Sequence, residues 1–150
     1  MLGSGGTYLA LKPALTAAAA SRTSAAQAAL TQGNTYEDQQ QWAQAITAYK
    51  AAIAGGLDNP DIRTDLGVAY FRSQQPKLAL EQYQAAQKQN PLHENSLYNQ
   101  GSVYAVTGNS TRAIALWQEY LKRFPAGVHA AEAKTLIGEV QAHGVSPSVK

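Results

Sequence analysis

The sequence predicts an all-α fold in which three helix pairs stack into a right-handed solenoid and one further helix closes its end. Two observations lead to this expectation. Four kinds of residue recur at a constant step of 34 positions, and prolines and glycines stand where each helix pair has to end. A fixed period of this length is typical of repeat proteins, in which each unit packs only on its neighbours.

The recurring residues suit two helices that cross closely. Small residues allow the backbones to approach, and aromatic side chains then fill the remaining space. Each class occurs three times in the same register: Gly33, Gly67 and Gly101; Tyr36, Tyr70 and Tyr104; Ala45, Ala79 and Ala113; and Tyr49, Tyr83 and Trp117.

Helix-breaking residues place the ends of the helices. Pro91 and Pro125 lie 34 positions apart and follow the second helix of their repeats, while Gly55, Gly56 and Pro60 end the first repeat. Asn109 or Ser110 is a suitable N-cap for the second helix of the third repeat. The predicted helices cover about 24–38, 42–54, 60–73, 76–89, 94–107 and 110–123, and a seventh near 128–142 closes the array.

The N-terminal segment allows two interpretations. Residues 1–15 are fairly apolar, but Lys12 and Pro13 interrupt them well before the ~20 apolar residues that a membrane span needs. They form either a loose tail or the trailing end of a membrane anchor. Residues 14–30 favour helix, either as a backward extension of the first repeat helix or as a short helix of their own. The predicted division is 1–25 for an N-terminal segment, 26–143 for the repeats (26–59, 60–93, 94–127) with their capping helix, and 144–150 for a tail.

Composition excludes several classes of function. Of the 150 residues, 45% are hydrophobic and 15% are charged, so the chain is globular. A formal net charge of +2 without a basic cluster argues against nucleic-acid binding. The sequence contains no cysteine, which excludes disulfides and zinc–thiolate sites. This composition fits both a cytoplasmic protein and a membrane-associated protein of the bacterial envelope.

Residues with catalytic or metal-binding potential have simpler structural explanations. His93, His129 and His143 lack the spacing that brings metal ligands together, and we expect them on the surface or in turns. Trp42 and Trp117 occupy positions in second helices that face the core. We therefore predict a protein that is not an enzyme and uses no metal or cofactor.

The repeat resembles the tetratricopeptide repeat family over about residues 26–127. The motif Leu-Gly-x-Ala-Tyr is complete in the second repeat, at Leu66, Gly67, Ala69 and Tyr70. The two other copies keep the glycine and the tyrosine; they read Gln100, Gly101, Val103 and Tyr104, and Gln32, Gly33, Thr35 and Tyr36.

This resemblance implies a concave groove lined by the first helices of the repeats, in which a partner binds. The family's groove positions, with two neighbours on the rim, fall on Leu30, Asn34, Glu37, Asp38, Asp61, Thr64, Asp65, Val68, Phe71, Arg72, Asn95, Tyr98, Asn99 and Ser102. Carboxylates beside apolar residues predict a protein or peptide segment that is basic and carries hydrophobic anchors.

Some family members clamp the acidic tails of heat-shock chaperones with Lys, Arg and Asn at five groove positions. This chain has Leu30, Asn34, Asp65, Asn95 and Asn99 there, and only the asparagine at position 34 matches. A carboxylate without cationic donors has no strong partner. The sequence therefore argues against chaperone-tail binding.

The resulting hypothesis is a non-catalytic scaffold for protein–protein interaction. An alternative is a structural subunit or assembly factor that docks on a bacterial membrane complex through its N-terminal segment. A third is self-association through the open ends of the solenoid.

Overall fold

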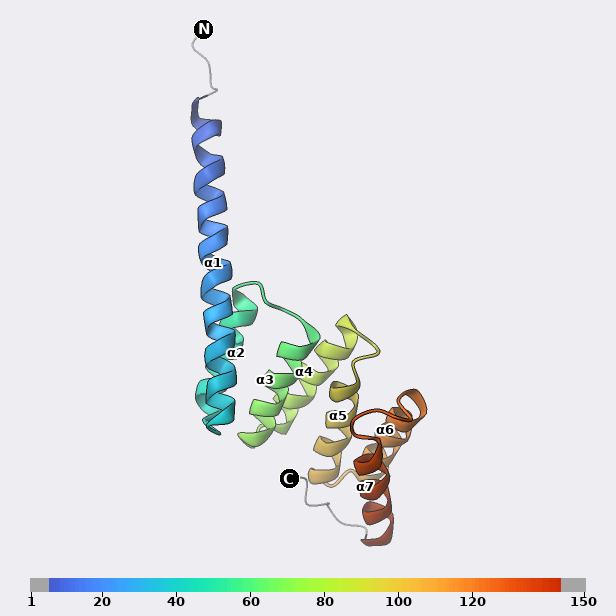
Figure 1. Cartoon of the computed structure of the whole chain (residues 1–150). Helices are drawn as coiled ribbons and strands as arrows, with labels where there is room; N and C mark the ends of the chain where they lie inside the picture. The colour runs from blue at the N-terminus through green and yellow to red at the C-terminus, as the bar shows by residue number, and fades with distance from the viewer. Residues whose placement is uncertain (1–5, 144–150) are drawn as a thin grey trace. The chain divides into compact units, whose positions relative to one another are not determined.

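The computed structural model describes residues 6–143, with side chains from residue 14 to residue 142 (Figure 1). Seven helices make up this part of the chain, arranged as three pairs and a final helix. They divide into two compact units, one extending to Asp58 and the other beginning at Asn59. Each unit is described by itself below.

The first unit consists of α1 (Gly6–Asp38) and α2 (Trp42–Ala54). We expected the first helix to begin near residue 24, but α1 is one continuous helix from Gly6 and extends beyond the end of α2 (Figure 1). The expected loose tail is therefore wrong for residues 6–15, while residues 1–5 lie outside the described part. Residues 14–32 contain neither glycine nor proline and are rich in alanine, the strongest helix former, so nothing ends the helix there. None of the described helices is both long and apolar enough to cross a bilayer.

The second unit contains the other five helices, whose bounds differ from the predicted ones by at most two residues. They are α3 (Pro60–Arg72), α4 (Pro76–Gln89), α5 (Glu94–Val106), α6 (Ser110–Arg123) and α7 (Ala130–His143). Local chemistry explains why they start where they do. The Asn59 side chain accepts a hydrogen bond from the Ile62 amide at 2.9 Å, and Pro60 stands at the first helical position. Asn109 caps α6 in the same way, by accepting from the Arg112 amide at 3.1 Å.

The turn inside each helix pair also repeats. Gln40, Gln74 and Gly108 are 34 positions apart, and all three have positive φ, at 57°, 61° and 86°. Only the third repeat supplies the glycine that this conformation favours. Backbone geometry is thus conserved between the repeats where side-chain chemistry is not.

The recurring glycines lie directly beneath aromatic rings. A Cβ atom on Gly33 would stand 2.7 Å from the Tyr49 ring, and one on Gly101 would stand 2.5 Å from Trp117. The expected core role of Trp117 is confirmed, because its side chain is fully buried and its indole donates to the Tyr98 carbonyl at 3.2 Å. Trp42 is only half-buried.

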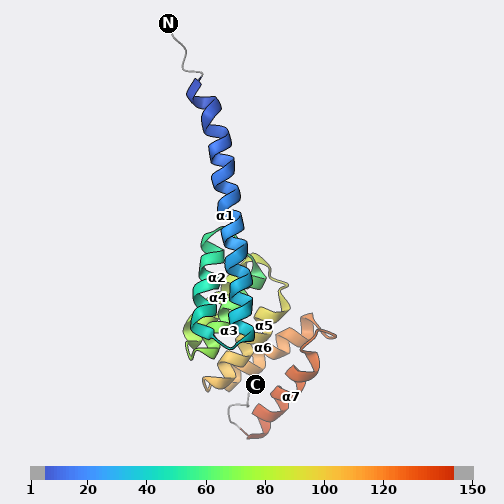
Figure 2. The same ribbon diagram turned by 60° about the vertical axis from the view of Figure 1, so that its left-hand side comes forward.

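The final helix closes the core of the second unit. Figure 2 shows α7 alongside α6. Ala133, Leu136 and Val140 are buried in one cluster with Trp117 and Tyr120, and Ile137 packs against it, so one face of α7 is an apolar stripe on the core.

A polar network fixes the loop before α7. The Glu94 carboxylate accepts hydrogen bonds from the Val128 amide at 3.0 Å and from the Tyr120 hydroxyl at 3.3 Å. The same hydroxyl accepts from the His129 amide at 3.0 Å. This network holds His129 beside the start of α5.

Candidate binding surfaces

A small hollow of about 190 Å³ opens in the second unit on the side of α3 and α5. Most of its lining comes from predicted groove positions, and α4 and the start of α7 complete it. The lining residues are Val68, Phe71, Arg72, Tyr83, Tyr98, Asn99, Ser102, His129 and Glu132.

A second hollow of about 390 Å³ adjoins the first at the C-terminal ends of α3 and α5. The two hollows share Phe71 and Arg72. Val106 lines the second hollow with 43% of its surface exposed, and Pro76 adds further apolar area. Together they form a partly apolar surface, here called the α3–α5 surface, with a half-buried Phe71 at its middle.

Arg72 places a cation on this surface, and Glu132 places a carboxylate there that lies 3.6 Å from His129 Nδ1. Arg72 is exposed, and its guanidinium group forms neither a hydrogen bond nor an ion pair with the side chains described, residues 14–142. An exposed cation next to apolar hollows can pair with a carboxylate that arrives from outside.

Tyr98 is placed differently from expectation. The sequence places it among the groove positions, where a partner should contact it, but its side chain is only 5% exposed. It stacks on the His129 ring at a centroid distance of 4.1 Å and meets the edge of Tyr120 at 5.8 Å. Burial raises the pKa of Tyr98 above its ordinary value, and the Glu132 carboxylate raises it further. Tyr98 therefore forms the floor of the first hollow and offers little contact area of its own.

Several predicted groove residues in the second unit already have partners. Thr64 is buried and donates to the Pro60 carbonyl at 2.8 Å. Asp61 contacts His93 Nε2 at 2.9 Å, although 83% of its side chain remains exposed. Asn95 contacts His129 Nε2 at 3.2 Å. Six of the 14 predicted positions line the first hollow: Val68, Phe71, Arg72, Tyr98, Asn99 and Ser102.

The remaining predicted positions belong to α1 in the first unit. The Tyr49 hydroxyl hydrogen-bonds to the Asn34 side chain at 3.1 Å and also to the Glu37 carboxylate. Leu30 is half-buried, and Asp38 is exposed. Glu37 is thus engaged within its own helix pair.

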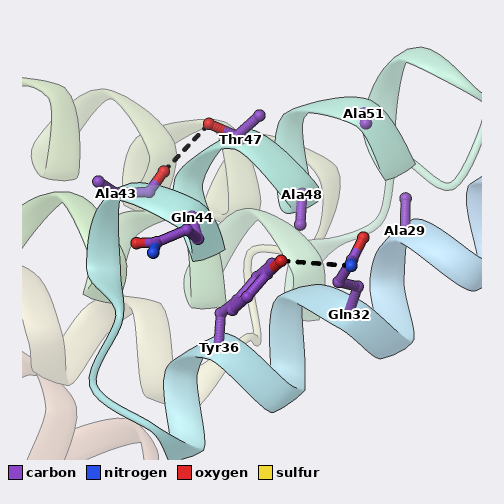
Figure 3. A pocket seen from close by; sticks show the side chains of 8 residues that line it. All are labelled: Ala29, Gln32, Tyr36, Ala43, Gln44, Thr47, Ala48 and Ala51. Atoms are coloured by element: carbon purple, nitrogen blue, oxygen red, sulfur yellow. Dashed lines mark hydrogen bonds between the residues drawn. The ribbon is translucent and has the colours of Figure 1, made fainter.

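The first unit carries a larger hollow that the sequence analysis did not predict. It measures about 450 Å³ and lies between α1 and α2 (Figure 3). Gln32 and Tyr36 project from α1 towards α2, and the Gln32 amide donates to the Tyr36 hydroxyl at 3.3 Å. We call it the α1–α2 hollow. It is lined by Ala29, Gln32, Tyr36, Ala43, Gln44, Thr47, Ala48 and Ala51.

Among the side chains that the structure describes, residues 14–142, no three His, Asp or Glu residues converge on a point where a metal ion could sit. His93 is mostly buried as the N-cap of α5, and His129 lies in the loop before α7.

The comparisons agree with the repeat geometry. A family model for the tetratricopeptide repeat matches residues 30–94 and again 64–128. The chain belongs to the tetratricopeptide repeat family. Domains of this family are typically non-catalytic interaction modules. A comparison with curated protein sequences found no match.

Several solved tetratricopeptide repeat structures have a similar fold. The TPR2B domain of yeast Sti1, in a complex with pHsp70, has a TM-score of 0.72 at 15% identity, covering 78% of this chain and 96% of that one. The first such domain of Spaghetti (RPAP3), bound to the HSP90 peptide SRMEEVD, reaches 0.70 at 21% identity, covering 80% and 95%. YrrB, a repeat protein with an unusual peptide-binding site, reaches 0.68 at 25% identity, covering 92% and 73%.

Proposed function

We propose that this tetratricopeptide repeat chain is a non-catalytic scaffold and that a segment of a partner protein binds on the α3–α5 surface. The similar domains of Sti1 and RPAP3 were solved with chaperone-derived ligands. These neighbours share the fold, and they support segment binding as a class of function. The choice of surface rests on this chain's own side chains.

The observation that carries the proposal is the position of Phe71. It borders both hollows of the second unit, so one partner segment crossing it has a partly apolar depression on each side. Val68 lies in the first hollow, and Val106 and Pro76 lie in the second. A few apolar anchors in desolvated pockets usually carry most of the binding energy of an interface.

The charged residues of this surface change the charge that we expect on the partner segment. The sequence predicted a basic segment, but Asp61 already pairs with His93, and Glu37 accepts from Tyr49 in the first unit. Arg72 is the exposed cation of the α3–α5 surface. The partner segment on this basis carries hydrophobic side chains for the two hollows and a carboxylate that pairs with Arg72.

Binding of a chaperone tail remains disfavoured on this proposal. The five positions that form the carboxylate clamp in chaperone-binding relatives are occupied here by Leu30, Asn34, Asp65, Asn95 and Asn99. None of them is cationic, and a single arginine does not replace a two-carboxylate clamp. The carboxylate we infer is a side chain within the segment, next to its apolar residues.

Docking on a bacterial membrane complex is the second candidate. The observation that favours it is the length of α1, which extends from Gly6 past the start of the first repeat, with residues 14–25 exposed. If the exposed part of α1 serves as the docking element, removal of the chain up to residue 25 abolishes association with the complex, while the α3–α5 surface still binds its partner segment.

Affinity capture followed by mass spectrometry first identifies the partner segment, and binding constants then test the surface. We expect Phe71→Ala to weaken binding on the order of tenfold or more, because a truncated anchor loses ~1–2 kcal/mol or more. Leu92→Ala is the matched control, since Leu92 is an apolar residue that is 69% exposed and lines neither hollow.

The charge is tested separately. Arg72→Gln is expected to reduce affinity modestly and to flatten its dependence on salt, because an exposed ion pair is screened by added ions. Lys88→Gln removes an exposed cation of α4 that lies outside both hollows and serves as its control. If folded Phe71→Ala and Arg72→Gln proteins bind the partner segment as the wild type does, the α3–α5 surface is not its binding site.

A further inference from the structure

The α1–α2 hollow has a specific cause in the sequence. One pair of positions, 19 residues apart, recurs at the 34-residue step, with one member on each helix of the pair. The third repeat has Leu97 and Leu116 at these positions. Leu97 belongs to the core cluster of the second unit, and Leu116 packs against it. The second repeat places Arg63 and Gln82 there, and the arginine donates to the glutamine at 2.9 Å.

The first repeat leaves this place empty. It has Ala29 and Ala48 in the same register, and both line the hollow (Figure 3). Truncating a pair of leucines or a bridging arginine to alanine leaves unfilled space between two helices. The first unit therefore presents a depression that the other two repeats fill with their own side chains.

The depression favours a helix of small residues with few charges. None of its eight lining side chains is charged, and four of them are alanines. Small side chains on both sides allow two helices to approach closely. A carboxylate on the partner helix finds no cationic donor in this lining and loses hydration there, whereas a cation can be accepted by the side-chain carbonyl oxygen of Gln32 or Gln44.

The chain itself carries a helix of this kind. Residues 14–25 of α1 are exposed, and Arg22 is their only charged residue. Leu15 keeps 65% of its surface exposed. A helical segment of this length gains little stability in water unless one of its faces is packed.

The geometry points to a symmetric dimer in which the exposed half of α1 from one copy lies in the α1–α2 hollow of a second copy, with the two α1 helices antiparallel. One stripe of α1 carries the contact: Ala18, Arg22, Ala25, Ala29, Gln32 and Tyr36 follow each other at steps of three or four residues. In an isologous dimer each copy contributes the same patch.

The stripe is self-complementary when the chains run in opposite directions. Its spacing is symmetric, so Ala25 lies opposite the second copy's Ala29 while Ala18 lies opposite its Tyr36. Arg22 then lies opposite the second copy's Gln32. In the single chain that amide donates to its own Tyr36, and in the dimer the carbonyl oxygen of Gln32 accepts a hydrogen bond from Arg22.

Sedimentation equilibrium on the full chain over a dilution series tests this pairing. The expected result is a mass that rises from one chain to two as concentration increases. Ala18→Glu places a charge into the hollow and is expected to leave a monomer at every concentration. Ala20→Glu is the matched control, because Ala20 is also exposed but lies on the opposite face of α1. The dimer of this variant should persist.

Cysteine cross-linking tests the register, since the natural chain has no cysteine. An oxidised mixture of Ala25→Cys and Ala29→Cys chains is expected to form a mixed disulfide dimer in high yield. A mixture of Thr23→Cys and Gln27→Cys chains is the control. Its two cysteines have the same spacing on the opposite face of α1, and we expect it to form little mixed disulfide dimer.

A wild-type chain that stays monomeric throughout the dilution series overturns the proposal and leaves α1 to other partners such as a membrane complex. Equal dimerisation of Ala18→Glu and Ala20→Glu also overturns it. Neither result affects the α3–α5 surface, whose variants Phe71→Ala and Arg72→Gln are expected to dimerise like the wild type.

Discussion

The α1–α2 pair of the first unit and the α5–α6 pair of the second unit are built on the same contact. Gly33 lies beneath Tyr49 in one pair, and Gly101 lies beneath Trp117 in the other. Between the helices, however, the first pair has a hollow where the last pair has Leu97 and a half-buried Leu116. The glycine and the aromatic ring set how two helices cross, and the residues outside the repeat motif decide whether the pair has an open face.

The two units also differ in how their apolar surface is covered. In the second unit, α7 covers Trp117 and Tyr120 with a stripe of its own. In the first unit, the exposed half of α1 covers nothing within its own helix pair. Unpartnered apolar surface in a repeat protein generally requires a cap or a partner, and this contrast leads to four predictions.

Removal of α7 is expected to have the largest effect. A chain ending at residue 127 exposes the side chains that Ala133, Leu136 and Val140 cover. We expect aggregation or a large loss of soluble protein, measured by size-exclusion chromatography. A chain ending at residue 143 is the control and should behave as the wild type. A soluble, equally stable monomer ending at residue 127 contradicts the capping role.

Leu97→Ala is expected to recreate in the third repeat the open face of the first. Leu97 is almost fully buried, and truncating such a leucine typically costs ~2–5 kcal/mol. Denaturant unfolding measures the loss. The converse change, Ala29→Leu, fills a hollow and should cost less than this in a dilute, monomeric sample. If Leu97→Ala and Ala29→Leu lower the free energy of unfolding equally, the first and third repeats do not differ in how the space between their helices is filled.

Gly67→Leu tests the contact that all repeats share. A Cβ atom on Gly67 would collide with the Tyr83 ring, so a larger side chain forces the helices apart. Overpacking of this kind typically costs ~1–3 kcal/mol. Gly138→Ala is the control within α7, where a Cβ atom meets nothing within 4 Å, and it should stabilise by ~0.5–1 kcal/mol. An unchanged melting temperature for Gly67→Leu contradicts the role of the glycine.

The smallest effect concerns the buried tyrosine of the second unit. Burial raises the pKa of Tyr98 in the folded chain, whereas an unfolded tyrosine ionises near ~10. Its contribution to stability is therefore fully present below pH ~10 and is lost as the pH rises above that value. Unfolding free energies across this range should fall less steeply for Tyr98→Phe, which cannot ionise. An equally steep fall in that variant shows that Tyr98 is not the group responsible.

The sequence by itself determined the helix pairs. The 34-residue register, the breaks at Pro60 and Pro91 and the cap at Asn109 set the helices from α2 to α7 to within two residues. These signals are local, because each depends on backbone dihedrals, capping groups or propensities within a few residues. The apolar stripe of α7 was predictable for the same reason.

Tertiary structure decided which side chains remain available. Tyr98 looks like an apolar anchor in the sequence, but His129 and Tyr120 stack around it, and their proximity depends on the loop before α7. Arg72 and Asp61 look equally free, yet among the residues that the structure describes only Asp61 has a partner, because His93 reaches it from the next helix pair. The hollow between Ala29 and Ala48 exists only because two helices bring these small side chains together. Exposure and pairing depend on contacts between distant segments, and no local pattern encodes them.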